Sequence, residues 1–251
     1  MIETINLRKT HGMTTVLHDV NLQIPQGKLT AIIGPNGAGK STALTLISRL
    51  VPITSGQVRI EGQDINTTAS DALARVMAIL RQDNQSTLRL TVRDLVAFGR
   101  FPHSKGRLTL EDKTHVDKAL AYLKLEELDG RFLDELSGGQ RQRAYIAMVL
   151  CQDTRYILLD EPLNNLDMAH AVGMMQLLRQ AVQDTGKTVV VVLHDINFAA
   201  SYADHIIAMK DGRLYCEGAP EHVVQDAVLS DLYEIRVRVH TVNGRRFCDY
   251  F

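Results

Sequence analysis

The sequence predicts an α/β fold organised around a phosphate-binding loop, and three observations support this. A short apolar stretch, residues 29–33, has the pattern of a buried strand and is followed at once by G-x-x-x-x-G-K-[ST]. From Lys40 onward apolar residues recur at helical spacing, so the pattern opens a helix. Two later apolar runs, residues 156–159 and 188–193, end in polar residues, and ligands bind at the carboxyl edge of such parallel strands.

The loop has the chemistry of a nucleotide site. Its glycines let a phosphate approach bare backbone, and the amide N–H groups of residues 37–42 would converge on phosphate oxygens at a helix N-terminus. Lys40 would reach the β- and γ-phosphates, and the Ser41 hydroxyl would bind Mg²⁺. The predicted nucleotide-binding residues of the loop are Gly34, Pro35, Asn36, Gly37, Ala38, Gly39, Lys40, Ser41 and Thr42.

Composition narrows the class of protein. A chain of 251 residues, 45% hydrophobic, suits one domain with a subdomain or two small domains. A net charge of −1 with scattered basic residues argues against a nucleic-acid partner. The start does not resemble a signal peptide and no apolar run approaches ~20 residues, so we expect a cytosolic chain that can still sit on a membrane partner. Cys151, Cys216 and Cys248 show no metal-ligand spacing, and we expect reduced thiols.

The first 80 residues predict strands on either side of the loop. Residues 2–24 alternate apolar and polar with a turn at His11-Gly12-Met13, which is typical of antiparallel strands, and residues 58–60 continue the same layer. A helix over residues 71–76 leads into a strand over 77–80. That strand delivers Gln82 at its carboxyl end.

Over residues 83–153 the sequence pattern becomes helical, which predicts an inserted helical subdomain. Thr91 with Asp94, and Thr109 with Asp112, have the spacing of capped helix starts. The last helix of the insert follows, and it begins near residue 137.

The start of that last helix is unusual. Ser137 and Gln140 have the S-x-x-Q spacing of a capping box, but Gly138 and Gly139 between them are poor helix formers. Something must therefore approach this backbone closely, and a phosphate at a helix N-terminus is the natural candidate.

Polar side chains follow the two later strands. Asp160 ends one strand and is expected to bind Mg²⁺, while Glu161 beside it could polarise a water in line with a γ-phosphate. Glu161 could instead be a second carboxylate for the metal. Residues 164–167 start a helix that ends near Gly186. His194 follows the strand at 188–193, where we prefer a phosphate contact to an ordinary core histidine.

The C-terminal part shows no chemistry of its own. Asp211-Gly212 predicts a hairpin between residues 206–209 and 213–216, helical stretches follow at 221–225 and 228–233, and Asn243-Gly244 predicts a last hairpin.

The ordered motifs resemble the ATP-binding subunits of ABC transporters over nearly the whole chain, and they are GPNGAGKST, Gln82, LSGGQ, YILLDEP, NNLD and His194. The LSGGQ motif at residues 136–140 is nearly private to that family. Residues 92–103, with LSGGQRQRAYIAM and VVLHDINFAASYADHIIAMKDG, are more narrowly similar to importers of ferric siderophores and related metal chelates.

The resemblance implies a P-loop NTPase with a RecA-like mixed sheet core, an antiparallel β-subdomain and an inserted α-helical subdomain. The nucleotide-binding core with its β-subdomain would cover residues 1–82 and 154–218 of a single ABC ATPase domain. The insert would cover 83–153, and a C-terminal tail 219–251.

The resemblance also implies roles for matching residues. Gln82 would sense the γ-phosphate and Mg²⁺, Glu161 would be the catalytic base, His194 the γ-phosphate switch and Asp167 part of a dimer contact. Magnesium would be held by Ser41, Gln82 and Asp160.

A head-to-tail homodimer is implied as well, in which the LSGGQ segment of one subunit closes over ATP on the loop of the other. Two-fold pairing gives both half-sites a partner through one interface. The residues that close over ATP would be Ser137, Gly138, Gly139 and Gln140.

Family partners would be polytopic membrane permease subunits and a periplasmic or surface substrate-binding protein. The chain would then lie at the cytoplasmic face of the membrane. Heme or cobalamin import stays open, as does a soluble ABC ATPase of iron–sulfur assembly, whereas DNA repair and translation types carry insertions or second cassettes that this chain does not show.

One position departs from the family pattern. The family usually stacks adenine on an aromatic residue, often Tyr before Gly, and His11 before Gly12 stands there. An imidazole can stack, but it offers less area than a phenol ring.

Overall fold

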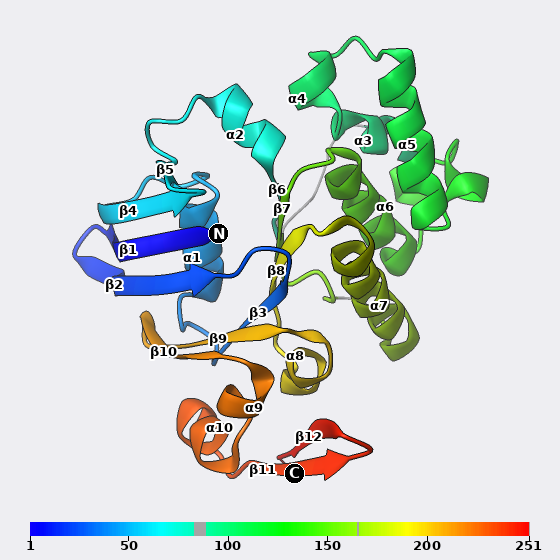
Figure 1. The fold of residues 1–251 in the computed structure, drawn as a ribbon. Coiled ribbons are helices and arrows are strands. Elements are labelled where there is room, and N and C mark those ends of the chain that lie inside the picture. Colours follow the sequence, from blue (N-terminus) through cyan, green and yellow to red (C-terminus); the bar gives the residue numbers. More distant parts are fainter. Residues whose placement is uncertain (83–88, 165, 251) are drawn as a thin grey trace. The chain divides into compact units, whose positions relative to one another are not determined.

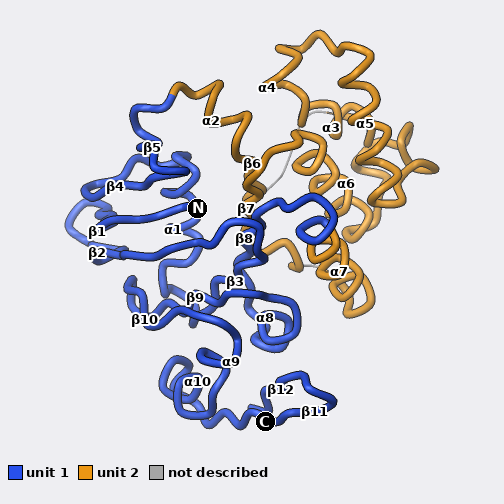
Figure 2. Tube along the Cα trace, viewed as in Figure 1, with its two compact units in different colours: residues 1–68, 181–251 blue, residues 69–180 orange. Residues whose placement is uncertain are grey.

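The computed structural model describes residues 1–82, 89–164 and 166–250. The chain forms two compact units, one of residues 1–68 and 181–251 and the other of residues 69–180 (Figure 2). We call them unit 1 and unit 2. The sequence places the helical insert at residues 83–153, and these domain boundaries stay a prediction.

Unit 1 begins with the predicted antiparallel layer, whose strands lie in the order β2-β1-β4-β5. The period-two pattern arises because alternate residues of a strand, such as Val58 and Ile60, are buried in the core. The strands are β1 (Ile2–His11), β2 (Thr14–Ile24), β4 (Ser55–Ile60) and β5 (Gln63–Asp64) (Figure 1).

A second sheet of unit 1 positions the phosphate loop. Strand β3 (Leu29–Ile33) pairs in parallel with β8 (Thr188–Val192) and with β9 (His205–Lys210), and β9 pairs antiparallel with β10 (Arg213–Gly218). Every residue of β3 and β8 is buried, which explains why both appear as continuous apolar runs. Because Ile32 lies opposite Val192, both strands end at the same edge of the sheet.

The rest of unit 1 follows the predicted tail, with small shifts at the ends. The second predicted helical stretch ends as expected at Tyr233, and the first stops at Val223 because Val224 leaves the helical conformation and Gln225 is extended. The elements are α1 (Lys40–Ile47), α8 (Ile196–Tyr202), α9 (Pro220–Val223), α10 (Asp226–Tyr233), β11 (Arg238–Val242) and β12 (Arg245–Asp249).

Unit 2 is mainly helical, and its predicted helix starts are confirmed. Thr91, Thr109 and Ser137 each form the expected capping box with the residue three positions later. The helices are α2 (Ser70–Val76), α3 (Val92–Phe98), α4 (Phe101–Ser104), α5 (Leu110–Tyr122) and α6 (Gly138–Cys151), with 3₁₀ turns η1 (Glu126–Leu128) and η2 (Leu133–Glu135).

Two parallel strands of unit 2 carry the other polar residues. Strand β6 (Met77–Leu80) pairs with β7 (Tyr156–Asp160), and Leu80 lies opposite Leu159. Helix α7 (Met168–Thr185) follows β7 and extends past residue 180, so that its last residues belong to unit 1. Across the described residues, no helix is both long and apolar enough to cross a membrane.

Candidate functional site

The phosphate loop of unit 1 has a backbone that requires glycine at two positions. Gly34 has φ +145°, and a Cβ there would lie 2.1 Å from the main-chain oxygen of Met209. Gly39 has φ +91° at the start of α1, and its Cβ would meet the Leu17 side chain at 2.6 Å. A side chain at either residue would displace a neighbour, so the glycines of the motif are needed to form the loop itself.

Lys40 is folded onto its own loop. Its side chain is buried, with 5% of the residue exposed, and Nζ donates to the main-chain oxygens of Gly34 (2.9 Å) and Pro35 (3.0 Å). A buried ammonium group needs such acceptors. The same charge at the N-terminus of α1 favours a bound anion.

Unit 1 also contains the two histidines predicted to contact the nucleotide, His194 and His11. His194 is exposed two residues after the end of β8, at the same sheet edge from which Gly34 leaves β3. His11 ends β1, is exposed and pairs with Thr14 at the start of β2. The Val16 main-chain oxygen of β2 would lie 3.4 Å from a Cβ on Gly39, so the strand beside His11 runs along the loop.

Unit 2 brings Gln82 and Glu161 together, as their strand-end positions predict. Gln82 Nε2 donates to Glu161 Oε2 at 2.7 Å. Asn164 Nδ2 donates to the same oxygen at 2.6 Å. The Glu161 carboxylate is therefore held in place by two amide groups, which is the arrangement that a positioned base requires.

The backbone of Glu161 is also unusual. Its φ is +51°, a left-handed conformation that costs a non-glycine residue about 1–3 kcal/mol and tends to persist at functional sites. Asp160, which precedes it, is 5% exposed and ends β7. The turn thus separates a buried residue, Asp160, from a partly exposed one, Glu161.

The start of α6 is a well-formed helix terminus. Gln140 N donates to Ser137 Oγ (3.3 Å), and Ser137 N donates back to Gln140 Oε1 (3.0 Å). A Cβ on Gly139 would find its nearest neighbour, Leu166 Cδ2, at 3.5 Å, which is ordinary van der Waals contact. Ser137 and Gly138 are exposed.

Asp167 caps α7 and contacts a histidine that the sequence analysis did not select. Its Oδ1 accepts from His170 N at 2.8 Å and lies 2.8 Å from His170 Nδ1. The backbone N–H of His170, followed by its ring, lowers the pKa of Asp167. The His170 ring lies 3.6 Å from the Cβ position of Gly139, so the segment carrying Asp167 packs against the first turn of α6.

The predicted metal ligands fit a hard cation. Ser41 offers a hydroxyl, Asp160 a carboxylate and Gln82 an amide oxygen, since its amide nitrogen is bonded to Glu161. Oxygen donors of these types suit Mg²⁺ rather than zinc. No group of three or more His, Cys, Asp or Glu residues in the described part of the chain is arranged to hold a metal.

The structure therefore assembles the predicted residues as local groups within each unit. The loop shares one sheet edge with His194, Gln82 contacts Glu161, and Asp167 contacts the first turn of α6 through His170. Sequence reasoning missed Asn164 and His170. Both lie three residues after a selected acid, a spacing that could have identified them. Asn165 lies outside the described residues.

Comparison with known proteins adds three findings. The family model described as ABC transporter matches residues 17–164. The petrobactin import ATP-binding protein YclP of Bacillus subtilis (strain 168) is 51% identical, covering 100% of both chains. The ferric enterobactin transport ATP-binding protein FepC of Escherichia coli (strain K12) is 41% identical, covering 91% of this chain and 85% of that protein.

A solved structure matches the fold. The dimeric post-hydrolysis state of the ATP-binding cassette MJ0796, bound to ADP and Pi, has a TM-score of 0.78 and 33% sequence identity. The match covers 88% of this chain and 99% of that chain.

Proposed function

The chain belongs to the ABC transporter family, and from this premise we propose that it is the ATP-hydrolysing subunit of an importer for iron(III)–siderophore complexes. Membership follows from a family model that matches more than half of the chain and from full-length relatives. The substrate class rests on relatives named for petrobactin import and ferric enterobactin transport. The hydrolytic role rests on the site.

The observation that carries hydrolysis is the Glu161 carboxylate, fixed by Gln82 and Asn164. In the proposed reaction a water oxygen attacks the γ-phosphorus, the bond from that phosphorus to the β–γ bridging oxygen breaks, and Glu161 accepts the proton of the water. The loop N–H groups and Lys40 stabilise the phosphate charge. His194 contacts the γ-phosphate.

Magnesium would be held by Ser41, Gln82 and Asp160, whose oxygen donors suit it. When bound, it would neutralise charge on the β- and γ-phosphates. We assign adenine contact to His11, whose exposed imidazole ends β1.

Two copies would share each ATP. The backbone at Ser137, Gly138 and Gly139, with Gln140, would approach the phosphates held by the loop of the other copy, and Asp167 would contribute to the same interface. The ordinary van der Waals contacts at the Gly139 Cβ position support this proposal, because nothing inside the subunit requires glycine there. The dimeric MJ0796 cassette, bound to ADP and Pi, provides the precedent.

The membrane partner would meet unit 2. Phe98 at the end of α3 and Phe101 at the start of α4 are 50% and 54% exposed, with the exposed Leu110 following at the start of α5. Exposed aromatic residues on neighbouring short helices are typical of a protein interface. We propose that polytopic permease subunits dock here, which would place the chain at the cytoplasmic face of the membrane. A periplasmic or surface binding protein would deliver the chelate.

Replacing the proposed base tests the enzyme. Glu161→Gln should lower the turnover number for ATP by about 10² to 10⁴-fold, equivalent to roughly 3–5 kcal/mol of barrier, because a positioned base is lost. ATP affinity should stay within twofold, since glutamine keeps the shape of the side chain. Phosphate release and nucleotide binding measure the two quantities. Glu127→Gln, on the exposed turn η1, is the matched control, and wild-type turnover in Glu161→Gln would remove Glu161 from this role.

Replacing the exposed aromatic residues tests the partner. Phe98→Ser combined with Phe101→Ser should abolish co-purification of a polytopic membrane protein with the tagged chain, while ATPase activity of the isolated chain persists. Phe247→Ser on β12, where the residue is 51% exposed, is the control. Growth of a deletion strain on defined ferric siderophores, heme and cobalamin then identifies the substrate. Normal growth on every ferric siderophore would contradict the proposal.

A further inference from the structure

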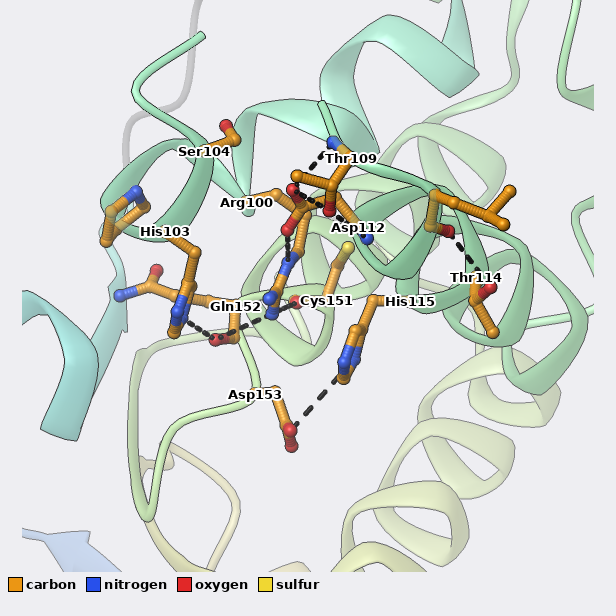
Figure 3. A network of polar contacts seen from close by, with 12 residues as sticks. Arg100, His103, Ser104, Thr109, Asp112, Thr114, His115, Cys151, Gln152 and Asp153 are labelled. Carbon is orange, nitrogen blue, oxygen red and sulfur yellow. Dashed lines mark hydrogen bonds and ion pairs between the residues drawn. The ribbon is translucent and has the colours of Figure 1, made fainter. Parts of the chain in front are cut away.

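A buried ionic network lies where α4, α5 and α6 of unit 2 meet (Figure 3). Arg100, between α3 and α4, and Asp112, in the first turn of α5, have side chains only 6% and 5% exposed. Arg100 Nε donates to Asp112 Oδ1 at 2.9 Å. Burying two charges is unfavourable unless their geometry is fixed and their remaining polar atoms are bonded, so the other contacts of this pair are informative.

The Arg100 guanidinium also binds the end of α6. Its Nη1 donates to the main-chain oxygens of Cys151 (3.0 Å) and Gln152 (3.4 Å), which are the last residue and the C-cap of that helix. His103 Nε2 lies 3.0 Å from the same Gln152 oxygen. A cation at the carbonyl end of a helix satisfies terminal acceptors and complements the helix dipole. Arg100 thus anchors the C-terminus of α6 to the turn between α3 and α4.

Asp112 fixes the position of the arginine in turn. Its Oδ2 accepts from Thr109 N (3.0 Å) and Thr109 Oγ1 (2.8 Å), which is the capping box of α5. The Thr109 backbone N–H, with Arg100, lowers the pKa of Asp112 to about 2. The carboxylate therefore stays ionised at neutral pH, and the pair cannot be neutralised by proton uptake.

Gly99 provides a second, steric link at the same turn. A Cβ there would lie 2.1 Å from the main-chain oxygen of Met148 in α6. The backbone before Arg100 therefore lies directly against the last turns of α6. If the α3–α4 turn moves, it must either displace α6 or break two contacts, which are the hydrogen bonds of Arg100 to the end of α6 and the packing of Gly99 against Met148.

The network also reaches the strand that leads to Gln82. Gln152 Nε2 donates to the main-chain oxygens of Ala74 (2.6 Å) and Met77 (3.1 Å), and Met77 is the first residue of β6. Gln82, just beyond the end of β6, bonds to Glu161. The contacts of Arg100 and Gln152 therefore connect to two places. One is the end of α6, whose other end is the glycine-containing start, and the other is the start of β6, the strand that leads to Gln82.

We propose that Arg100 is a positioning residue that transmits contact at Phe98 and Phe101 to the glycine-containing start of α6. These phenylalanines flank the α3–α4 turn and are exposed, whereas Arg100 between them is buried. Helix α6 has 14 residues, so at 1.5 Å per residue it carries a displacement across about 20 Å to Gly138 and Gly139. This inference rests on the proposed function, because it takes the membrane subunits to touch Phe98 and Phe101.

The decisive variant replaces the ion pair by an apolar pair. Arg100→Met with Asp112→Leu keeps the buried volume, and such exchanges usually preserve the fold. We expect ATPase activity of the isolated chain and co-purification of the membrane subunits to stay within twofold of wild type. The rise in ATPase activity that the membrane subunits cause in a reconstituted complex should fall at least about tenfold, the effect of losing charge-assisted hydrogen bonds.

Two further variants serve as controls. One tests whether the positive charge of Arg100 is sufficient without its guanidinium geometry, and the other tests whether loss of any ion pair in unit 2 has the same effect. Arg100→Lys can still pair with Asp112, but it lacks the fork that reaches the α6 carbonyls at the same time, so stimulation should be intermediate. Arg93→Met with Asp117→Leu removes an exposed ion pair of the same unit, at 2.8 Å, together with the exposed contact of Arg93 to Asp129, and should leave stimulation unchanged. Arg100→Lys also decides the matter should the double variant fail to fold, because wild-type stimulation in it would overturn the proposal.

Hydrogen–deuterium exchange on the isolated chain gives a readout without the partner. In the Arg100→Met and Asp112→Leu double variant, amides of residues 141–145 should exchange about tenfold faster than in wild type or in the Arg93→Met and Asp117→Leu control. Unchanged exchange at 141–145 would overturn the inference. If the membrane subunits do not stimulate the wild-type chain, the proposed function fails instead, and the exchange experiment still decides the role of Arg100.

Discussion

Two helix starts in this molecule carry glycines for different reasons. At the phosphate loop, Gly34 and Gly39 have left-handed or similarly restricted backbones, and a side chain on either would overlap a neighbour. At the start of α6, Gly139 lies in helical conformation with ordinary space around its Cβ position. The loop would not form without its glycines, whereas α6 would be a better helix with alanine.

The loop needs its glycines in order to fold, whereas the start of α6 has a glycine that the folding of its own subunit does not require. A residue that its own fold does not require, and that lowers helix propensity, must serve a contact outside the folded subunit. The capping box of Ser137 and Gln140 offsets part of the lost helix propensity. The α6 start is therefore expected to be completed by a second molecule, and three substitutions can break or sharpen this comparison.

The largest effect is expected at the loop. Gly34→Ala adds a Cβ 2.1 Å from the Met209 oxygen at a φ of +145°. The backbone conformation alone costs about 1–3 kcal/mol in unfolding free energy, and the overlap adds to it. Urea unfolding should show this loss, and ATP binding should disappear. If Gly34→Ala keeps wild-type stability and normal ATP binding, the loop does not require glycine at this position, and the proposed difference between the loop and the start of α6 is wrong.

Gly139→Ala should separate stability from turnover. Alanine in a helix stabilises it by about 0.5–1 kcal/mol relative to glycine, so the unfolding free energy should rise slightly. Turnover of ATP should nevertheless fall at least about tenfold, because the methyl group occupies the space that a phosphate of the second copy needs. Unfolding curves and steady-state kinetics on the same preparation test the expected rise in unfolding free energy and the expected fall in ATP turnover. A variant that is more stable and fully active would leave the glycine without a function. Gly130→Ala, at a position with open space, is the control.

The smallest effect is expected at the cap. Ser137→Ala should cost about 1 kcal/mol of unfolding free energy, since Gln140 N loses its acceptor. Ser137→Asp keeps an acceptor for the helix but places a negative charge where the phosphate would approach. We expect Ser137→Asp to be as stable as wild type yet at least as impaired in turnover as Ser137→Ala. Equal activity of Ser137→Asp and wild type would mean that Ser137 only caps the helix.

Local patterns predicted much of this structure. The capping boxes at Thr91, Thr109 and Ser137 could be read because cap and partner lie three residues apart. The buried strands could be read because nearly every residue in them is apolar. These signals depend on neighbours along the chain, and they placed Gln82 and Glu161 at the carboxyl edge of one sheet; that their strands are adjacent is a finding of the structure.

What the sequence did not reveal depends on distant contacts. Asp112 could be identified as the capping-box partner of Thr109, but its pairing with Arg100 requires the α3–α4 turn to lie against α6. The left-handed backbone of Glu161 is likewise set by the turn and not by its residue type, because glutamate rarely adopts it. Pairings of this kind become visible only once the helices are packed.

The lysine of the loop has one further consequence. Because Nζ of Lys40 donates to the carbonyl oxygens of both Gly34 and Pro35, its positive charge holds the backbone of the loop together. Phosphate oxygens of a nucleotide would replace these carbonyl oxygens as acceptors of the Lys40 ammonium group, so binding would require an exchange of hydrogen-bond partners and no refolding of the loop.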